Sequence, residues 1–468
     1  KNYYNRQPND ANNNRLTDDV YLDVWQFNST AVKPNDNSAK DIVMKVNPAS
    51  YGGLLGFAFC DGSIRFSMPK SVPTQNWSGS SYGENTYSGK DFFQCTAFAY
   101  DGNGLPYATA APGESSEGMG DVYYFYAGDK AFGVGFTAVD TYSNMAKDRF
   151  KSPSIAVSSD GSYAYLAYYD LLTGEIRFMG GKKDGDNGWG TIKNNYSGYT
   201  AKKNLSEEQE LLQVVANGSG NALGHSGEYV SIDVVQQNVT TGKDVVVLVW
   251  YDSHAGNLMY AYNDNPTAAT TGKNKTNWSP VKTIFTGAGE YCQIVADAKG
   301  GLHIAAYDGT NGDLKYAYLS KYDSDYDESS DSCTVDSYAI IGQNLTIDVA
   351  LDSSETAVPY IGYYGLSSTK PKIAYKVSAT VTDGASDDIY TSGWEVSIVP
   401  TSSRVPQDRV NVAVWKNSTG VISDSTKGTS SAGTYYGTCY GNGTGNPVLG
   451  YQIRESSTSG YIETAQMQ

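Results

Sequence analysis

The sequence predicts an all-β protein, and three observations lead to that class. Glycine and tyrosine are abundant, with 50 and 39 of the 468 residues. Short runs of alternating apolar and polar residues, rich in β-branched and aromatic side chains, recur between Gly-rich turns along the chain. One phrase of strand, turn and strand is also repeated with small changes. We therefore expect short antiparallel strands throughout and few helices.

The repeated phrase is clearest at residues 302–320, which read LHIAAYDGTNGDLKYAYLS. Residues 165–180 (YLAYYDLLTGEIRFMG) and 247–263 (VLVWYDSHAGNLMYAYN) nearly repeat it. Each copy is an alternating run, a Gly-containing turn and a second alternating run, which is the pattern of a β-hairpin. Around the copy at 302–320, YCQIVADAKG precedes and CTVDSYAI follows as further alternating runs. One unit therefore predicts four strands, a to d, in a meander.

Seven such units follow one another, most of them at a period of about 50 to 57 residues. The first contains GLLGFAFCDGSIRFSM, and the second FFQCTAFAYDGNGLPYATAAPG with DVYYFYAG after it. The third to fifth carry the phrase above, the sixth contains LTIDVALDSSETAVPYIGYYG and PKIAYKVS, and the seventh ends in TYYGTCYGNGTGNPVLGYQI. The expected b–c turns lie near Asp61, Gly113, Asp170, Asp252, Asp308, Gly365 and Gly441.

Seven four-stranded units without long helices predict a seven-bladed β-propeller of four-stranded antiparallel blades. A single four-stranded sheet cannot bury both of its faces, whereas sheets stacked around an axis bury one another. A solenoid is the alternative fold, but it would need capping units at its ends, and none is evident in the sequence. Residues 1–468 then form a single propeller domain.

The two ends of the chain fit a closed ring. Residues 20–28, VYLDVWQFN, have the pattern of a d strand, and DIVMKV after them that of an a strand. We expect the N-terminal strand to close the ring by completing the seventh blade, beside the strand of residues 446–454. The tail GYIETAQMQ is either a further strand or the lead into further domains beyond the C-terminus.

The phrase at residues 303–317, HIAAYDGTNGDLKYA, resembles a β-propeller repeat of uncharacterised secreted or cell-surface bacterial proteins, H-I-x-Y-Y-D-x-x-x-G-D-L-x-Y-A. The third and fourth units match it well, and the first, second, sixth and seventh more loosely. The resemblance implies a propeller on an extracellular or cell-surface protein. It implies no single activity, because this fold hosts enzymes, lectins and adhesins alike.

Charge and hydropathy exclude several partners. Thirty-four basic against 50 acidic residues give a formal net charge of −16, so nucleic acid and anionic membrane surfaces would be repelled. No apolar run reaches the roughly 18 residues of a membrane span, so no membrane insertion is expected. Five widely spaced cysteines predict neither a disulfide scaffold nor a zinc site.

Alignment of the a strands predicts a mostly acidic ring at one mouth of the propeller channel. The first position of each strand holds Asp41, Asp91, Lys151, Glu228, Glu290, Gln343 or Asp408. Three residues later come Met44, Gln94, Ser154, Ser231, Gln293, Thr346 and Asn411, and six of these seven are polar, as a wet channel would favour. Arg409, Tyr229, Tyr291 and His225 complete the candidate ligand-binding residues. The ring would bind a cation or the hydroxyls of a sugar, or its acids are solvated strand ends that accept loop N–H groups.

A glycosidase would need two carboxylates roughly 5 to 10 Å apart. Every blade offers a similar residue, so no catalytic pair stands out, and we assign no catalytic residue. Sialidase chemistry would need several arginines around one carboxylate, whereas only Arg149 and Arg409 lie near strand starts.

Two features lie outside the repeat. Residues 196–228 form the longest connection, and SEEQELLQVVANG within them predicts a short helix near 205–215 on the d–a face, as a lid, a docking surface or plain decoration. Two acidic stretches on c–d connections offer alternate oxygen ligands for calcium, although a solvated acidic loop is the alternative. Their candidate metal ligands are Asp184, Asp186, Asp323 and Asp325. Calcium is the one cofactor that the sequence suggests.

Taken together, the sequence favours a non-catalytic extracellular recognition module, adhesin-like or glycan-binding, whose partner is a glycan or a host or cell-surface protein. Seven similar units present seven similar surfaces, and exposed tyrosine with Asn, Ser and Gly is typical of recognition surfaces. Two competing functions are an extracellular carbohydrate-active enzyme using carboxylates at the channel mouth, and a structural module of a larger surface assembly.

Overall fold

The computed structural model describes residues 25–32, 40–46, 55–60, 62–69, 82–92, 94–101, 106–111, 122–127, 134–140, 150–158, 161, 163–170, 174–182, 213–216, 226–236, 244–266, 278–337, 340–351, 355–365, 370–376, 393–399, 406–414, 429–430, 433–434, 447–454 and 460–467. Over these residues the fold is all-β. Seven four-stranded antiparallel sheets account for most of them. The one helix described is a single turn, α2 (Glu328–Asp331). No helix in these ranges is long and apolar enough to cross a membrane.

Six sheets follow the predicted meander, each made of four successive strands. The first sheet is β2 (Lys40–Val46), β3 (Leu55–Cys60), β4 (Gly62–Pro69) and β5 (Tyr82–Phe92). The second is β6 (Gln94–Tyr100), β7 (Pro106–Ala111), β8 (Val122–Ala127) and β9 (Val134–Asp140). The third is β10 (Phe150–Val157), β11 (Tyr163–Asp170), β12 (Glu175–Lys182) and β13 (Gln213–Ala216).

The fourth sheet is β14 (Ser226–Gln236), β15 (Asp244–Asp252), β16 (Asn257–Asn263) and β17 (Lys282–Phe285). The fifth is β18 (Glu290–Ala296), β19 (Leu302–Asp308), β20 (Asp313–Leu319) and β21 (Ser332–Asp336). The sixth is β22 (Ile341–Leu351), β23 (Ala357–Gly365), β24 (Lys370–Lys376) and β25 (Trp394–Ile398). A two-stranded hairpin, β27 (Thr429–Ser430) and β28 (Gly433–Thr434), is separate from them.

The seventh sheet joins the two ends of the described chain. Its order is β26 (Pro406–Ala413), β29 (Val448–Arg454), β30 (Gly460–Met467) and β1 (Trp25–Val32). The N-terminal strand is the outer strand, as expected, but it pairs with β30 and not with residues 446–454. The prediction was wrong by one strand, because 446–454 is the second strand of the sheet and the tail supplies the third. Gly441, near which the b–c turn was predicted, precedes the second strand and lies outside the described residues, as do residues 455–459 between β29 and β30.

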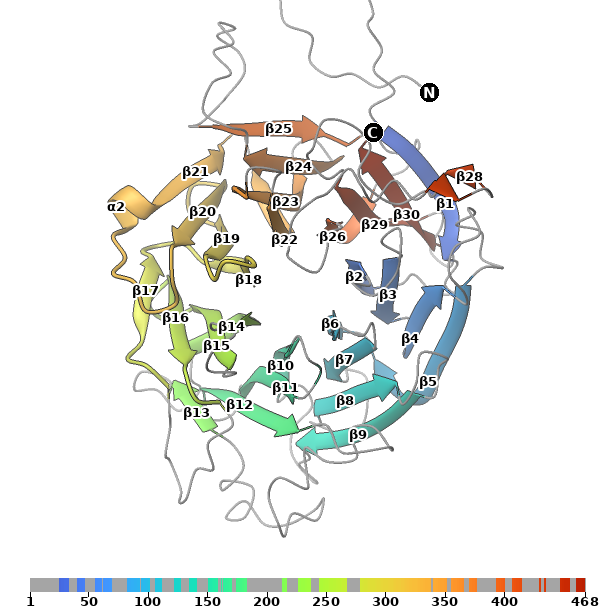
Figure 1. Ribbon diagram of the computed structural model, residues 1–468, viewed down its shortest axis with the longest axis horizontal. Helices are drawn as coiled ribbons and strands as arrows, with labels where there is room; N and C mark the ends of the chain where they lie inside the picture. The colour runs from blue at the N-terminus through green and yellow to red at the C-terminus, as the bar shows by residue number, and fades with distance from the viewer. Residues whose placement is uncertain are drawn as a thin grey trace, which may run out of the picture.

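The sheets are arranged around an axis, as in β-propellers (Figure 1). Their first strands lie nearest the centre and contact one another in sequence, β2 with β6, β6 with β10, β10 with β14, β14 with β18, β18 with β22, β22 with β26 and β26 with β2. The hydrophobic core is divided between neighbouring sheets. Separate buried clusters join the third sheet to the fourth, the fourth to the fifth, the fifth to the sixth and the sixth to the seventh.

The repeated phrase corresponds to a repeated turn between the second and third strands. Asp308 Oδ1 accepts the backbone N–H groups of Thr310 and Asn311 at 3.0 Å each. Asp252 Oδ1 does the same for the two equivalent residues of the fourth sheet. The glycine that ends each turn has a positive φ, 81° at Gly312 and 71° at Gly256, which a residue with a Cβ adopts only at a cost. The motif Asp-x-x-x-Gly therefore specifies this turn, since the Asp accepts its backbone N–H groups and the Gly adopts its positive φ.

The predicted helix at 205–215 is wrong over its last three residues. Residues 213–216 are β13, the outer strand of the third sheet, paired with β12. Their sequence, QVVA, is β-prone, and pairing with a neighbouring strand decides the conformation of so short a run. Residues 226–228 likewise begin β14, so the inserted loop predicted at 196–228 includes parts of two strands. Residues 196–212 and 217–225 lie outside the described residues.

Candidate functional site

A cavity of about 830 Å³ lies on the axis and is lined by residues of all seven innermost strands. This volume falls within the range of about 300 to 1,000 Å³ typical of small-molecule sites. The strands that form its wall surround the centre of Figure 1. The cavity is therefore the candidate site.

Each innermost strand carries a register shift close to its start. In β18, for example, Glu290 pairs with Tyr307 and Gln293 pairs with Ala305, so three steps on one strand oppose two on the other. This is the geometry of a β-bulge, which inserts a residue and re-aims the side chains beside it. The shift lies near the start of the inner strand in every sheet, although in β6 it comes later in the alignment, between Cys95 and Ala97, and it affects one end of the cavity.

Four innermost strands in a row, β10, β14, β18 and β22, share an unusual backbone conformation. In each of them the residue that follows the first position of the a-strand alignment has a positive φ although it is not glycine. These residues are Ser152 (46°), Tyr229 (56°), Tyr291 (53°) and Asn344 (51°), and all four line the cavity. A left-handed conformation costs a residue with a Cβ about 1 to 2 kcal/mol. Backbone strain of this kind is concentrated at functional sites.

Tyrosines of the fourth and fifth sheets form a row at this end of the cavity. The ring centroids of Tyr229 and Tyr291 are 4.6 Å apart with an interplanar angle of 39°. Tyr251 on β15 lies 6.5 Å from Tyr229, and Tyr307 on β19 lies 6.1 Å from Tyr291. We call these four residues the tyrosine row. The structure thus brings together the two tyrosines that the sequence proposed, Tyr229 and Tyr291.

The environment of Tyr307 is polar on one side. Burial raises the pKa of its hydroxyl, a hydrogen bond with the Gln343 side chain offsets part of the rise, and the charge of Glu290 adds to it. The phenol therefore remains neutral at physiological pH. The end of the row carries a carboxylate and an amide within reach of one hydroxyl.

Six residues of the second predicted layer line the cavity, namely Met44, Ser154, Ser231, Gln293, Thr346 and Asn411, while the side chain of Gln94 lies outside the described residues. Several of the six bond the neighbouring strand. Ser154 Oγ accepts the N–H of Ile232 at 3.2 Å, and Ser231 Oγ accepts that of Ile294 at 3.1 Å. Thr346 Oγ1 accepts the N–H of Val412 at 2.8 Å. These groups belong to strand edges that would otherwise present unpaired amides to the cavity. The layer therefore joins adjacent sheets.

The same device joins the first and last sheets. Asn411 on β26 accepts the N–H of Met44 at 3.3 Å and donates to the carbonyl of Ile42 at 2.6 Å. Its side chain is 1% exposed. These two bonds cross 367 and 369 residues of sequence, and they connect β26 directly to β2.

Sequence reasoning did not identify a further layer, two residues along the same strands. Asp233 accepts the N–H groups of Val234 and Ala296 at 2.8 and 2.7 Å. Asp348 accepts those of Val349 and Val414 at 2.9 and 2.8 Å. The signal was present as Ser-x-Asp in one unit and Thr-x-Asp in another. Because each carboxylate bonds two backbone amides, its role is to hold neighbouring strands.

The structure places the predicted acidic ring differently. Glu290 does not line the cavity, because its carboxylate lies against the turn of its own sheet, where a Cβ on Gly309 would be 2.9 Å from Oε1. Asp91 is in β5, an outer strand, and not at the start of an inner strand. Lys151 does line the cavity. The bulge explains the difference, since it brings the following residue to the axis.

For the remaining predicted residues only the backbone is described. Asp41 lies on β2, Glu228 on β14, and Asp408 and Arg409 on β26, all close to the bulges. Their side chains, like the whole of His225, lie outside the described residues. Their membership of a binding site remains a prediction.

The acidic stretch that contains Asp323 and Asp325 lies on the neighbouring sheet. Residues 320–331, which we call the strap, leave β20 and run along β17, the outer strand of the fourth sheet. Lys282 Nζ donates to the carbonyl of Ser324 at 2.9 Å, and the Tyr326 hydroxyl donates to that of Ile284 at 2.8 Å. Even-numbered residues face the sheet in this way, while Asp323, Asp325 and Asp327 are exposed.

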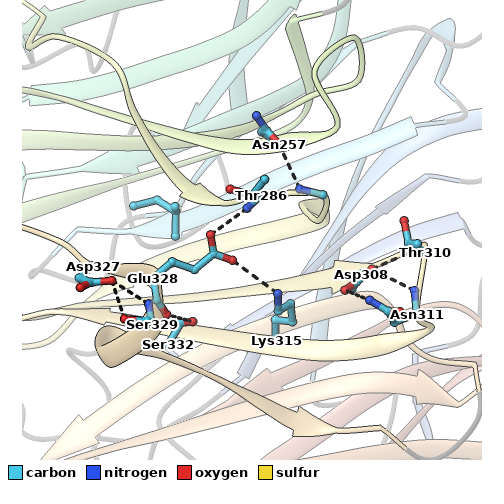
Figure 2. A network of polar contacts seen from close by, with 12 residues as sticks. Asn257, Thr286, Asp308, Thr310, Asn311, Lys315, Asp327, Glu328, Ser329 and Ser332 are labelled. Atoms are coloured by element: carbon cyan, nitrogen blue, oxygen red, sulfur yellow. Dashed lines mark hydrogen bonds and ion pairs between the residues drawn. The ribbon is translucent and has the colours of Figure 1, made fainter.

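Glu328 fastens the end of the strap (Figure 2). Its Oε2 accepts the N–H of Thr286 at 3.1 Å, and its Oε1 lies 3.6 Å from Lys315 Nζ. Asp327 caps the helix α2 by accepting the N–H of Ser329 at 2.9 Å. Asp323 pairs with Lys321 at 3.1 Å.

The described residues contain no group of three or more His, Cys, Asp and Glu side chains that could hold a metal ion. Asp184 and Asp186 lie outside those residues. Calcium binding therefore stays a prediction.

No protein-family model matches this chain, and no curated protein matches it. Solved structures resemble it at about a tenth sequence identity. A mutant of AofleA from Arthrobotrys oligospora has 10% identity, a TM-score of 0.43, and a match covering 82% of this chain and 92% of that chain. The Dos1 propeller has 10% identity, a TM-score of 0.42, and coverage of 95% and 94%.

Prolyl oligopeptidase B from Galerina marginata has 10% identity, a TM-score of 0.40, and coverage of 89% of this chain and 46% of that chain. The present chain thus spans about half the length of that enzyme. Likenesses at this level carry no conclusion about the activity of this chain.

Proposed function

We propose that this protein is a non-catalytic extracellular recognition module, a seven-bladed β-propeller that binds a glycan at the mouth of its axial cavity. Closure of the ring by the N-terminal strand belongs to the proposal. Its support is the succession of contacts between innermost strands, which includes β26 with β2, and the hydrogen bonds of Asn411 to β2.

One observation carries the binding proposal: strained, cavity-lining Tyr229 and Tyr291 stand side by side at the bulged ends of two inner strands. Packing alone does not require a left-handed tyrosine, because Ser152 and Asn344 occupy the same position in adjacent strands. Rings held in this way offer a rigid surface, partly apolar and partly polar, to a ligand. Recognition through such a platform also suits an adhesin-like role at a cell surface.

A carbohydrate-active enzyme, the competing function, needs a free acid and a second carboxylate. The two described carboxylates that line the cavity, Asp233 and Asp348, each accept two backbone N–H groups and so serve the wall. If the cavity mouth binds no glycan, the partner would be a host or cell-surface protein. A structural role in a larger surface assembly would require neither a glycan nor a protein ligand at the cavity.

A glycan array with the full chain tests the proposal, together with a hydrolysis assay on every glycan that binds. We expect binding without cleavage. Cleavage of a bound glycan would make the protein an enzyme. Absence of binding to any glycan would reject the glycan and favour the protein partner or the structural role.

A further inference from the structure

The tyrosine row continues from the cavity onto the fourth and fifth sheets. Tyr229 and Tyr291 lie on innermost strands and line the cavity, and Tyr251 and Tyr307 lie on the strands beside them. Successive centroids are 6.5, 4.6 and 6.1 Å apart. The two middle rings of the row therefore line the cavity, and its two ends lie on the second strands of the fourth and fifth sheets.

The rings of Tyr229 and Tyr291 are held in place by the hydrophobic clusters on which they pack. Tyr229 packs against the buried cluster shared by the fourth and fifth sheets, and Tyr291 against the cluster shared by the fifth and sixth. The N–H of Tyr229 also donates to Ser152 Oγ at 3.1 Å, and its carbonyl accepts from Cys292 Sγ at 2.9 Å. Ordering these side chains on binding therefore costs little, which favours affinity.

The polar groups around the row suit hydroxyl ligands. Gln343 bonds the Tyr307 hydroxyl, Glu290 lies close to the same phenol, and Asn344 lines the cavity beside Tyr291. Side-chain amides donate and accept hydrogen bonds, and carboxylates accept them, in directions that their planar groups fix. The C–H face of a pyranose ring, which carries partial positive charge, meets the negative face of an aromatic ring.

Charge decides between classes of glycan. The charge of Glu290 acts on Tyr307 at one end of the row, and the whole chain has a formal charge of −16, although Lys151 lies elsewhere in the cavity wall. A sialic or uronic acid would be repelled both locally and at long range. Neutral sugars meet no such cost.

We propose that the tyrosine row binds a neutral pyranose, stacked on Tyr229 and Tyr291 at the cavity mouth. This inference rests on the proposed glycan-binding function and assigns its ligand class and its contact residues. A longer oligosaccharide would extend from this ring toward Tyr251 or Tyr307.

The experiment compares neutral with sialylated and uronic-acid oligosaccharides on an array of the full-length protein, followed by calorimetric titration with the strongest neutral binder. We expect neutral ligands to be preferred, with affinity nearly unchanged between about 0.05 and about 0.5 M NaCl. Tyr229→Ala and Tyr291→Ala should each weaken binding about tenfold or more, the loss expected when one stacking contact is removed.

Two conservative variants separate binding from folding. Tyr291→Phe retains the ring and should bind within about threefold of the parent, whereas Tyr291→Leu retains bulk without a π face and should behave like the alanine variant. Tyr318→Ala is the matched control, because Tyr318 is 38% exposed on β20 and does not line the cavity. Thermal unfolding of each variant checks that the fold persists.

The outcomes are distinct. Neutral glycan binding that survives both Tyr291→Leu and Tyr229→Ala would overturn this inference while the proposed function stands. A salt-sensitive preference for anionic glycans would overturn it in the same way. Absence of binding to every glycan would reject the proposed function together with the inference.

Discussion

Asn411 is the most direct point at which to test how the first and seventh sheets are joined. Leucine has a similar volume but no polar atoms, so Asn411→Leu removes both hydrogen bonds to β2 without leaving a cavity. The N–H of Met44 and the carbonyl of Ile42 then lose this partner in a place where the side chain is 1% exposed.

The magnitude follows from the groups affected. Each buried backbone group left without a partner costs about 1 to 3 kcal/mol, and burial of a leucine side chain returns about 1.5 to 3 kcal/mol. Two groups lose their partner, so the centres of these ranges leave a net loss of about 2 kcal/mol. Unfolding entropy of about 2 cal/mol/K per residue gives about 1 kcal/mol/K for a chain of this length, so Tm should fall by about 2 °C.

Differential scanning calorimetry and urea unfolding measure the change. Thr310→Leu is the control, since Thr310 is exposed in a turn and bonds Asp308 through its backbone N–H, and its effect should stay within about 0.5 kcal/mol. If Asn411→Leu melts with the parent protein and shares its urea midpoint, the bonds to β2 carry no stability and the reasoning fails.

Three more predictions concern the fifth and sixth sheets and the turns. Lys372→Met leaves the buried Asp336 without its cation and should destabilise the fold by about 3 to 5 kcal/mol in urea unfolding; a loss below about 1 kcal/mol would contradict a buried ion pair. Burial alone would raise the pKa of Asp297, but the hydrogen bond and charge of His303 and the turn amides outweigh it and lower that pKa. The ionised carboxyl therefore stabilises the fold above about pH 4, and this contribution is lost as the pH falls through the folded pKa. Asp297→Asn should reduce the difference in unfolding free energy between about pH 6 and about pH 3. An unchanged difference would show that this carboxyl is not linked to folding. Gly256→Ala should cost about 1 to 2 kcal/mol through its φ of +71° alone, since a Cβ there meets nothing within 4 Å, and Gly256→Asn should cost less; equal stability of all three proteins would refute the strain.

Much of the fold could be predicted because its local chemistry is repeated. The alternating runs and the Asp-x-x-x-Gly turns indicate antiparallel four-stranded sheets, and the all-β prediction is confirmed. The strand order of the seventh sheet was predicted wrongly because residues 446–454 and 460–467 have the same alternating pattern. Neither segment contains a residue that specifies whether it is the second or the third strand of the sheet. A four-residue outer strand such as β13 is specified by its partner strand more than by its own residues.

The site was less predictable, for a geometric reason. An alternation pattern assumes two residues per repeat, and a bulge adds one residue without changing composition. The alignment named both Glu290 and the following Tyr291 as candidates, and only the bulge decides that Tyr291 is the one that lines the cavity. Tyr229, also named, occupies the same position one sheet earlier.

Spacing likewise suggested a calcium loop at residues 323–325, because alternate aspartates look the same whether they converge on an ion or point away from a surface. The flanking side chains, Tyr322 and Tyr326, pack toward the fourth sheet and leave Asp323 and Asp325 exposed. Calcium binding by these aspartates stays a prediction.

The strap has a consequence for how such a chain can grow or shrink during evolution. One copy of the repeat supplies residues 320–331, and the preceding copy receives them along β17. If an extra copy were inserted between these two, Glu328 would lie beside a strand that did not evolve with it, and Thr286 would lose its acceptor. Duplication or loss of a single unit at this boundary would therefore be selected against, whereas the two units copied together would remain complementary.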